Sequence, residues 1–446
     1  MRLPGWAGQA RWRPSPVRPI AVDASDTGFD GAPGPAGLEV TRELARLTLD
    51  GAQTVVQITR PATPGRFPAL IFAHGAGTGN HTAFDEHAEA LAGDGIVCLA
   101  PDKDLAAYTS FRRDYGHMAR QYAELRGWAA TQGWADPERL GYYGESEGAW
   151  VVPWAAAMSG AAFVALVSPP VVTPREQGLY ALGRYLEAVG APESVFDAAL
   201  GFAGAAWPRG WMGYVDFDSV GYLAALDCPV LVVYGTADIS MPVVQGAQRV
   251  IAEAPGPVAV RYYEGADHGL RVGESKRLSP DFLRDLSGWL RGGSMTPRVA
   301  GPVPVQPFAA VSPPPSGPMA THVYTGAAGL LALGVAGMGL RKEPRLRLPL
   351  ALVRFGAVAT VLAHAHYLRL LASLATSYRT DPKAVRVGHR LVRLLGLATV
   401  AAGTAVAVRA RRSRSRRALA AVAAGLGGAA ALLSLAGRWG AFGRLL

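Results

Sequence analysis

Hydrophobic and polar positions along residues 38–292 predict a series of alternating strands and helices. Two runs with alternating apolar residues, at 39–49 and 53–59, are typical of a β-hairpin that enters a sheet. After them, short apolar runs that indicate buried strands are separated by helical patterns of ten or more residues. The predicted buried strands are 68–73, 95–100, 140–143, 163–167, 229–234 and 258–263, and the predicted helices are 82–92, 115–132, 149–158, 243–253 and 280–290. This alternation predicts an α/β domain with a mainly parallel sheet and helices on both faces.

Two flanking segments lack any such period. Residues 1–37 are rich in Gly, Pro, Ala and Arg, which predicts a disordered lead-in. Residues 293–319 contain eight prolines and are predicted to form a semi-rigid linker.

One segment inside the α/β region departs from the alternation. Residues 170–226 have no clear strand pattern but several helical patterns with nine aromatic residues. Aromatic residues at helical spacing most often pack into a core. An insertion at this point of an α/β fold is, however, well placed to form an apolar lid over the strand ends, where such sheets bind ligands. We expect a lid, and its candidate substrate contacts are Tyr180, Trp207 and Trp211.

The composition changes after residue 319 to mainly Ala, Gly, Leu and Val. Four apolar stretches, at 320–340, 348–374, 391–408 and 418–436, are near the length of about 20 residues that a membrane-spanning helix needs. The alternative, a water-soluble bundle, requires a polar face on every helix, and the first and fourth stretches have none. We therefore predict a multi-pass transmembrane helical region at 320–446, with the second stretch interrupted by Arg and His residues.

Charge is divided between the same two regions. Residues 1–293 hold 24 Lys and Arg against 32 Asp and Glu, whereas residues 294–446 hold 20 against 2. The basic residues lie between apolar stretches, as in membrane-flanking loops, so the net charge of +10 does not predict nucleic-acid binding. Four spans and the positive-inside rule would place the N-terminal domain outside, yet no secretory signal is visible in residues 1–37. Either the second stretch does not span or one basic cluster lies on the unexpected side, and we expect a cytoplasmic catalytic domain.

Two groups of potentially reactive residues receive no predicted role. Cys98 and Cys228 lie in or beside predicted strands and are interpreted as buried apolar residues. His364 and His366 lie in an apolar stretch, but two residues apart on a helix they point about 200° from each other. We therefore predict no metal site.

The motif Gly144-Glu145-Ser146-Glu147-Gly148 lies between the predicted strand 140–143 and the predicted helix 149–158. Strand, sharp turn and helix form the context in which Gly-x-Ser-x-Gly is a nucleophile elbow. The turn holds the serine in strained backbone angles, and the glycines let neighbouring chain approach without Cβ clashes. Ser146 is therefore the candidate nucleophile.

Acyl transfer by serine also needs a base, a carboxylate that orients the base, and N–H donors for the oxyanion. Asp238 follows the predicted strand 229–234, and His268 follows the predicted strand 258–263. The order Ser146, Asp238, His268 is the order found in α/β-hydrolases. The candidate oxyanion donors are the backbone N–H groups of Glu147, Gly75 and Ala76.

The acid and the base each have a simpler interpretation. Asp238 alone is compatible with a helix cap before Pro242, and His268 alone with a surface turn. Asp267 is a second acidic candidate, but a carboxylate adjacent in sequence to its histidine rarely points at the same ring.

Four segments, 74–77, 144–148, 235–238 and 267–269, together resemble the α/β-hydrolase superfamily. Within it, Gly-Glu-Ser-Glu-Gly-Ala-Trp followed by a strand and Ser-Pro-Pro at 168–170 is similar to esterases of the dienelactone hydrolase and acyl-thioester hydrolase type. The resemblance covers residues 38–292 and implies the α/β-hydrolase fold and hydrolysis of acyl bonds without a metal or organic cofactor; the insertion at 170–226 would be its helical lid. Dienelactone hydrolases proper have a cysteine nucleophile where this chain has Ser146, so serine esterases are the better comparison.

The predicted function is that of a membrane-tethered serine hydrolase that cleaves lipophilic carboxylic esters or acyl thioesters through an acyl-enzyme. Its predicted partners are a small-molecule acyl ester and a lipid bilayer. Two enzymatic alternatives are an acyltransferase and an aminopeptidase-like serine peptidase, in which Glu145 and Glu147 would bind a substrate amine instead of making surface contacts. A non-enzymatic alternative is a catalytically idle hydrolase fold that serves as a binding or scaffold module.

Overall fold

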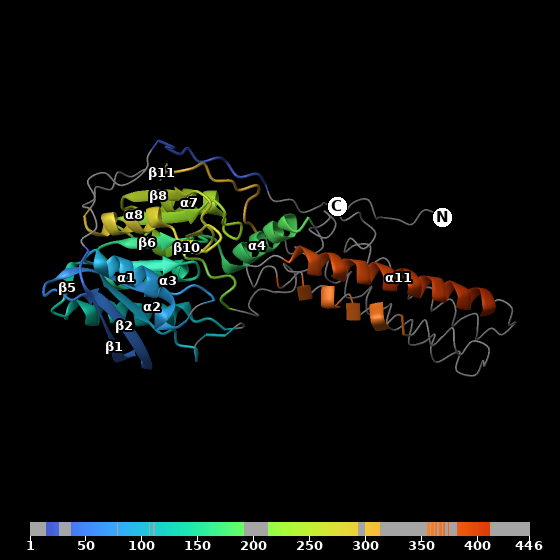
Figure 1. The fold of residues 1–446 in the computed structure, drawn as a ribbon, viewed down its shortest axis with the longest axis horizontal. Coiled ribbons are helices and arrows are strands. Elements are labelled where there is room, and N and C mark those ends of the chain that lie inside the picture. Colours follow the sequence, from blue (N-terminus) through green and yellow to red (C-terminus); the bar gives the residue numbers. More distant parts are fainter. Residues whose placement is uncertain are drawn as a thin grey trace. The chain divides into compact units, whose positions relative to one another are not determined.

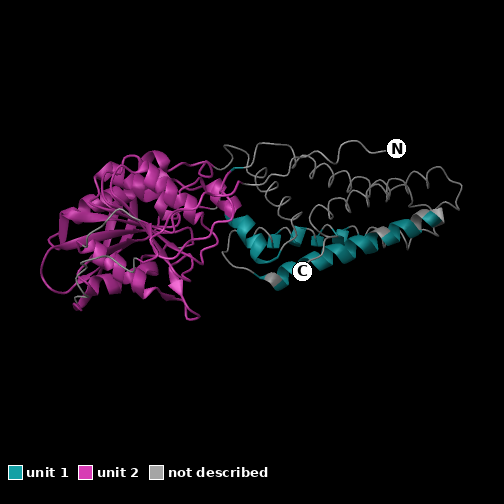
Figure 2. Cartoon of the chain, turned by 90° about the horizontal axis from the view of Figure 1, so that it is seen from above, with its two compact units in different colours: residues 1–13, 181–208, 312–446 teal, residues 14–180, 209–311 magenta. Residues whose placement is uncertain are grey.

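The computed structural model describes residues 15–25, 37–77, 79–106, 108–109, 112–190, 213–292, 299–312 and 381–410, with parts of 355–373. The chain divides into two compact units, which we describe separately (Figure 2). One consists of residues 14–180 and 209–311, and the other of residues 1–13, 181–208 and 312–446.

The first unit is built on a nine-stranded sheet (Figure 1). Its strand order is β1-β2-β4-β3-β5-β6-β7-β8-β11, and all neighbours from β4 to β11 are parallel. The strands are β1 (Val40–Leu49), β2 (Ala52–Pro61), β3 (Phe67–Ala73), β4 (Val97–Pro101), β5 (Ala135–Glu145), β6 (Val164–Val167), β7 (Val230–Gly235), β8 (Val258–Tyr263) and β11 (Val299–Ala300). The predicted hairpin is confirmed: β1 pairs with β2 around Asp50 and Gly51, whose positive φ angles of 45° and 79° suit a tight hairpin turn.

Helices cover both faces of the sheet, as the sequence predicted (Figure 1). Residues of α2, α3, α6 and α7 share one hydrophobic core with one face, and residues of α1 and α8 share a second core with the other. The helices are η1 (His81–Phe84), α1 (Asp85–Gly93), α2 (Tyr115–Ala130), α3 (Gly148–Ser159), α4 (Pro174–Ala188), α6 (Val220–Leu223), α7 (Val243–Glu253) and α8 (Pro280–Leu290). Adjacent residues of one strand supply the two cores, for example Tyr142 and Tyr143 of β5.

Residues that we expected to lie outside the domain add a strand to its edge. Asp23, from the expected disordered lead-in, donates its N–H to Val299 O at 2.9 Å, and Val299 belongs to β11, which pairs with β8. In the expected linker, the buried Gln306 accepts the N–H groups of Val244 and Gln245 through Oε1, each at 2.9 Å. These N–H groups belong to the first turn of α7 and have no partner within the helix. The N-cap residue, Pro242, does not bind them through its side chain. Backbone and side-chain hydrogen bonds therefore hold both segments, which composition alone did not reveal.

The expected lid segment is described only in part. It contains α4 and α6, and residues 191–212 lie outside the described residues. The buried Arg175 at the start of α4 pairs with Asp216 through Nε and Oδ1 at 2.7 Å, which joins the two described parts of the segment. The position of the segment over the strand ends stays a prediction.

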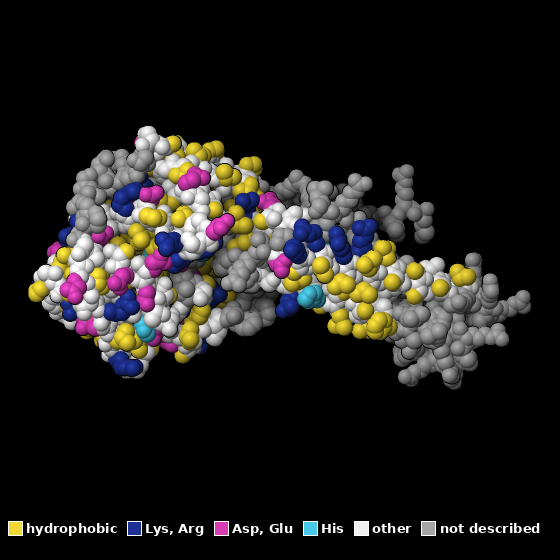
Figure 3. Space-filling view, in the orientation of Figure 1, with side chains coloured by type: hydrophobic (Ala, Val, Ile, Leu, Met, Phe, Trp, Pro, Cys, Tyr) yellow, Lys and Arg dark blue, Asp and Glu magenta, His cyan; other side chains and the backbone are white. Residues whose placement is uncertain are grey.

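The second unit contains the long helix α11 (Pro382–Ala410). Its buried residues contact the described residues of 355–373: the Oγ1 atoms of Thr360 and Thr399 lie 3.2 Å apart, and the rings of Tyr367 and His389 5.9 Å apart. Figure 3 shows Lys and Arg side chains along one side of α11, with hydrophobic side chains next to them.

The structure leaves the transmembrane prediction unconfirmed. Among the residues it describes, no helix combines the length and the apolar character needed to cross a membrane. The predicted stretches 320–340 and 418–436 lie outside the described residues, as does His364. His366 is exposed to solvent.

Candidate active site

The elbow lies at the carboxyl end of β5, near the centre of the sheet. Ser146 stands between Glu145, the last residue of β5, and Glu147, which directly precedes α3. Its φ of 53° is in the left-handed region that a residue with a Cβ seldom adopts. Its N–H donates to Val167 O at 2.9 Å, which ties the turn to the end of β6. The strained turn predicted from the motif is therefore present.

Both glycines of the motif are required by close backbone approach. A Cβ added to Gly148 would lie 2.3 Å from Ala73 O, the end of β3. A Cβ added to Gly144 would lie 2.7 Å from Val152 Cγ2 and 2.9 Å from Ala149 N. The elbow thus packs tightly between the neighbouring strand and its own helix.

Asp238 and His268 come together from the ends of β7 and β8. His268 Nδ1 lies 2.8 Å from Asp238 Oδ2, and the Asp238 side chain is 1% exposed. The other carboxylate oxygen, Oδ1, accepts the N–H of Ser240 at 2.8 Å and its hydroxyl at 2.6 Å. Both oxygens of Asp238 are therefore engaged, and the simpler interpretation of this residue as a lone helix cap is wrong.

The pair shifts the pKa values of both groups. Burial by itself raises the pKa of Asp238, but the charge and hydrogen bond of His268 and the bonds from Ser240 outweigh it and lower that pKa. Burial likewise lowers the pKa of His268, but the charge and hydrogen bond of Asp238 outweigh it and raise that pKa above 6.5. The carboxylate thus stabilises the protonated form of the ring.

Two serines for which we predicted no role support this pair. Ser240 holds Asp238 as described, and Ser168 Oγ donates to the main-chain oxygen of His268 at 2.7 Å. Ser168 has a φ of 47°, directly after β6. The two prolines that follow Ser168 were the available signal in the sequence, and nothing there indicated which atom it would bind.

Asp267 points elsewhere. Its Oδ1 accepts the N–H groups of Gly269 and Arg271, and its Oδ2 pairs with Lys276 Nζ at 2.9 Å. This carboxylate organises the turn that carries His268.

The loop after β3 carries the other candidate oxyanion donors, Gly75 and Ala76. His74, at its start, is buried and donates Nε2–H to Pro101 O at 2.6 Å. Burial lowers the pKa of His74 to about 4, so its ring is neutral at physiological pH. A Cβ added to Gly75 would lie 3.4 Å from Ser146 Cβ, which places this loop against the elbow.

Glu147 is neither a surface contact nor a free ligand for a substrate amine. Its side chain is 1% exposed and pairs with Lys103 Nζ at 3.2 Å and with Arg113. The hydroxyls of Tyr108 and Tyr115 donate to it at 2.7 and 3.0 Å. Glu145 also lies inward, where burial raises its pKa despite the opposing charge of His268.

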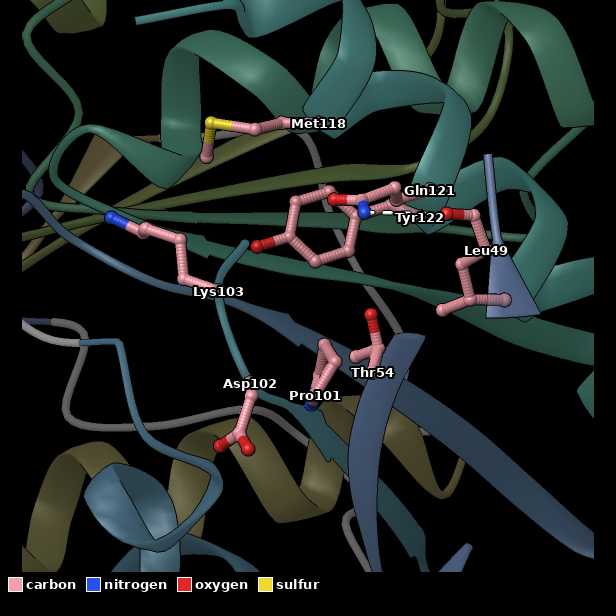
Figure 4. Close-up of a pocket in the computed structure, with 8 residues that line it drawn as sticks. All are labelled: Leu49, Thr54, Pro101, Asp102, Lys103, Met118, Gln121 and Tyr122. Atoms are coloured by element: carbon pink, nitrogen blue, oxygen red, sulfur yellow. Dashed lines mark hydrogen bonds between the residues drawn. The ribbon is translucent and has the colours of Figure 1, made fainter. Parts of the chain in front are cut away.

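Two cavities lie near these residues. The smaller, about 10 Å³, has room for about one water and is too small for a substrate (Figure 4). Figure 4 shows Asp102 and Lys103 leaving the end of β4 in different directions. The larger, about 240 Å³, is lined by Arg112, Arg113, Asp114, Tyr115, Gly116, Trp154, Gly213, Tyr214 and Phe217. It adjoins Glu147, because Arg113 and Tyr115 contact both.

The predicted substrate contacts are not brought together among the described residues. Trp207 and Trp211 lie outside the described residues. Tyr180 is 2% exposed and packs against the ring of Phe308 at 5.1 Å. Its substrate contact stays a prediction. Within the described ranges, no cluster of three or more His, Cys, Asp or Glu side chains is suited to hold a metal ion.

Comparison with known proteins classifies this domain. Residues 107–292, which include the elbow and both candidate partners, match the prolyl oligopeptidase family. This domain is an α/β-hydrolase. It is a serine hydrolase, and the superfamily resemblance predicted from the motifs is confirmed. No curated protein matches the chain.

Solved structures similar to the α/β-hydrolase domain include three enzymes. A dienelactone hydrolase from Anabaena variabilis is 15% identical over 56% of this chain and 94% of its own, with a TM-score of 0.37. Acetyl xylan esterase 1 from Thermoanaerobacterium sp. is 16% identical over 60% and 96%, with a TM-score of 0.38. An esterase from Pyrobaculum calidifontis is 15% identical over 56% and 84%, with a TM-score of 0.41.

Proposed function

We propose that the domain hydrolyses carboxylic esters or acyl thioesters through Ser146, His268 and Asp238. The observation that carries this proposal is the bond of 2.8 Å between His268 Nδ1 and Asp238 Oδ2. These residues follow β8 and β7, parallel strands of the sheet in which the strained Ser146 follows β5. With Nδ1 bound to the carboxylate, His268 keeps Nε2 for proton transfer.

In the proposed reaction, Ser146 Oγ attacks the carbonyl carbon while its proton passes to His268 Nε2. The carbonyl oxygen becomes an oxyanion that accepts the N–H of Glu147 and one from the loop at Gly75 and Ala76. As the intermediate collapses, the C–O or C–S bond breaks and the leaving group takes the proton from His268. Water then attacks the acyl-enzyme in the same manner, and the free acid leaves.

A lipophilic substrate is supported by the larger cavity, which adjoins Glu147, although neither Ser146 nor His268 is part of its lining. Trp154 and Phe217 of its lining stack at 6.0 Å, and Tyr115 contacts Phe217 at 4.9 Å, which gives it aromatic walls. A volume of about 240 Å³ suits a small acyl or alcohol group rather than a long chain.

The second candidate is a serine peptidase, which the match to the prolyl oligopeptidase family favours. The Glu147 carboxylate opposes the aminopeptidase form of this idea, because Lys103 and Arg113 already neutralise it in the interior. A substrate amine would have to displace the buried Lys103 and the partly exposed Arg113 to reach it.

A substrate panel separates the two candidates. We expect p-nitrophenyl acetate and butyrate, and the corresponding thioesters, to be hydrolysed with kcat/KM at least about 100-fold above that of aminoacyl and prolyl p-nitroanilides. The physical reason is that the described part of the site offers aromatic surface, while Lys103 and Arg113 already occupy the Glu147 carboxylate. Faster cleavage of the anilides would reverse the assignment.

We further propose that residues 320–446 tether the enzyme to a lipid bilayer as a multi-pass region, with the catalytic domain on the cytoplasmic side. The 20 basic against 2 acidic residues after residue 293, placed between apolar stretches, support the tether. Exposed apolar side chains on α11, including Leu394 (64%) and Val408 (57%), are also consistent with lipid contact.

Membrane fractionation tests the tether. The full chain is expected to resist carbonate extraction, which removes proteins held only by charge, and its catalytic domain to be digested by protease added to inside-out vesicles. Recovery of the chain in the carbonate supernatant would contradict the tether, and protection in inside-out vesicles would contradict the orientation.

A further inference from the structure

The loop between β4 and α2, together with the first residue of α2, directs four side chains at one carboxylate. Lys103, Tyr108, Arg113 and Tyr115 all donate to Glu147, the residue after the candidate nucleophile. The side chains of Lys103 and Glu147 are each 1% exposed. Burial lowers the pKa of Lys103, and the charge of Glu147 counteracts this shift.

Stability alone does not account for such a pair. Removing two charges from water costs several kcal/mol per ion, and well-packed apolar residues often serve the fold as well or better. The geometry suggests a more specific purpose, because the same donors also hold the loop after β3.

Lys103 Nζ makes a second hydrogen bond, to Gly75 O at 2.8 Å. The carbonyl of Gly75 and the N–H of Ala76 belong to one planar trans peptide and point in opposite directions. Drawing the carbonyl towards Lys103 therefore turns the Ala76 N–H away from Lys103. The hydroxyl of Tyr108 has one hydrogen, which it shares between Glu147 Oε2 at 2.7 Å and Ala76 O at 3.2 Å, so it links the same carboxylate to the next peptide of this loop.

We propose that Lys103, together with Tyr108, is a positioning residue for the oxyanion site, and that the Glu147 carboxylate anchors both. This inference rests on the proposed function. Glu147 supplies one oxyanion donor through its own N–H, and its side chain holds the lysine that orients the donor on the opposite loop. The two halves of the oxyanion site are thus linked by the Lys103–Glu147 pair.

Replacing Lys103 by methionine in the full-length protein tests this proposal. Methionine keeps the unbranched apolar stem but removes both hydrogen bonds, while Arg113, Tyr108 and Tyr115 remain as partners for Glu147. We expect kcat/KM for p-nitrophenyl butyrate to fall about 10- to 100-fold through kcat, with KM within about 2-fold of the wild-type value.

The second measurement is the inhibition constant of a boronic acid that forms a tetrahedral adduct with the serine. General structural damage would not change this constant in proportion to kcat/KM. We expect the constant to rise by the same factor by which kcat/KM falls, because both depend on oxyanion binding. Arg139→Met is the matched control, since Arg139 Nη2 also donates to a main-chain oxygen, Leu290 O at 2.9 Å, but near the opposite end of β5. It should leave both constants unchanged.

The outcomes separate this inference from the proposed function. A wild-type enzyme that reacts through Ser146, with K103M giving unchanged kcat and an unchanged boronate constant, would overturn the inference alone. A wild-type protein as unreactive as S146A would overturn both. Should K103M fail to fold, Tyr108→Phe is the second variant, because it removes only a hydroxyl. It is expected to lower kcat about 3- to 10-fold and to leave KM nearly unchanged. An unchanged kcat in this variant would overturn the inference.

Discussion

Replacement of Ser146 by alanine is expected to lower kcat for ester hydrolysis by about 10⁶-fold and to abolish covalent labelling by a fluorophosphonate. The elbow places this hydroxyl at the end of β5 in a strained turn, and the proposed mechanism has no other group that forms the acyl-enzyme. Alanine keeps the Cβ and should leave the fold intact.

The measurement is gel fluorescence after labelling, together with turnover of p-nitrophenyl butyrate. Ser159→Ala is the matched control, because it makes the same change at the far end of α3. This control should label like the wild-type protein. Equal labelling of S146A and the wild type would remove Ser146 from the mechanism, and absence of labelling in both would favour the idle scaffold.

Replacement of Asp238 by asparagine is expected to lower kcat by about 10⁴-fold with little change in KM. Ser240 donates twice to Oδ1, so an amide oxygen would take that position and leave the NH₂ group facing His268 Nδ1. Nδ1 would then have to accept, which puts the proton on Nε2. In that tautomer His268 is unable to take the proton of Ser146.

The pH profile provides an independent reading of the same pair. His268 must be neutral to act as base, and Asp238 raises its pKa, so wild-type kcat/KM should rise with pH through a midpoint above 6.5. In D238N the carboxylate charge is gone, and the residual activity should have its midpoint at lower pH. A midpoint that does not move would contradict the proposed role of Asp238.

Asp267→Asn is the matched control for this pair. Asp267 binds Gly269, Arg271 and Lys276. Of the two aspartates, Asp238 is the one bonded to the ring of His268. We expect D267N to retain activity within about 10-fold of the wild-type value. A larger loss in D267N than in D238N would exchange the assignments of the two acids.

The location of Glu147 bears on which acyl bond is cleaved. Sequence position alone left it open as a ligand for a substrate amine, but Lys103 and Arg113 neutralise it inside the protein. The larger cavity beside it presents aromatic rings and the guanidinium of Arg113, which lies 4.7 Å from the centre of the Tyr214 ring. The aromatic rings of this lining suit an apolar group.

Several errors of prediction share one cause. The lead-in at residues 15–25 and the linker at 299–312 have compositions typical of irregular chain, yet Asp23, Val299 and Gln306 bond to the domain. Sequence composition reports whether a segment is able to form its own core. It does not report whether the edge of an existing sheet or the first turn of α7 offers hydrogen-bond partners.

The sequence by itself determined the order of strands and helices, the elbow at Ser146, and the positions of Asp238 and His268 after consecutive strands. These follow from apolar period and from the small set of residues that tight turns accept, both of which are local. The sequence favoured Asp238 over Asp267, but only the tertiary structure shows the bond from Asp238 to His268, and it alone decided that Lys103 joins Glu147 to Gly75. The physical reason is that such bonds join residues 28 to 44 positions apart, which only the packing of the sheet and its loops brings within reach.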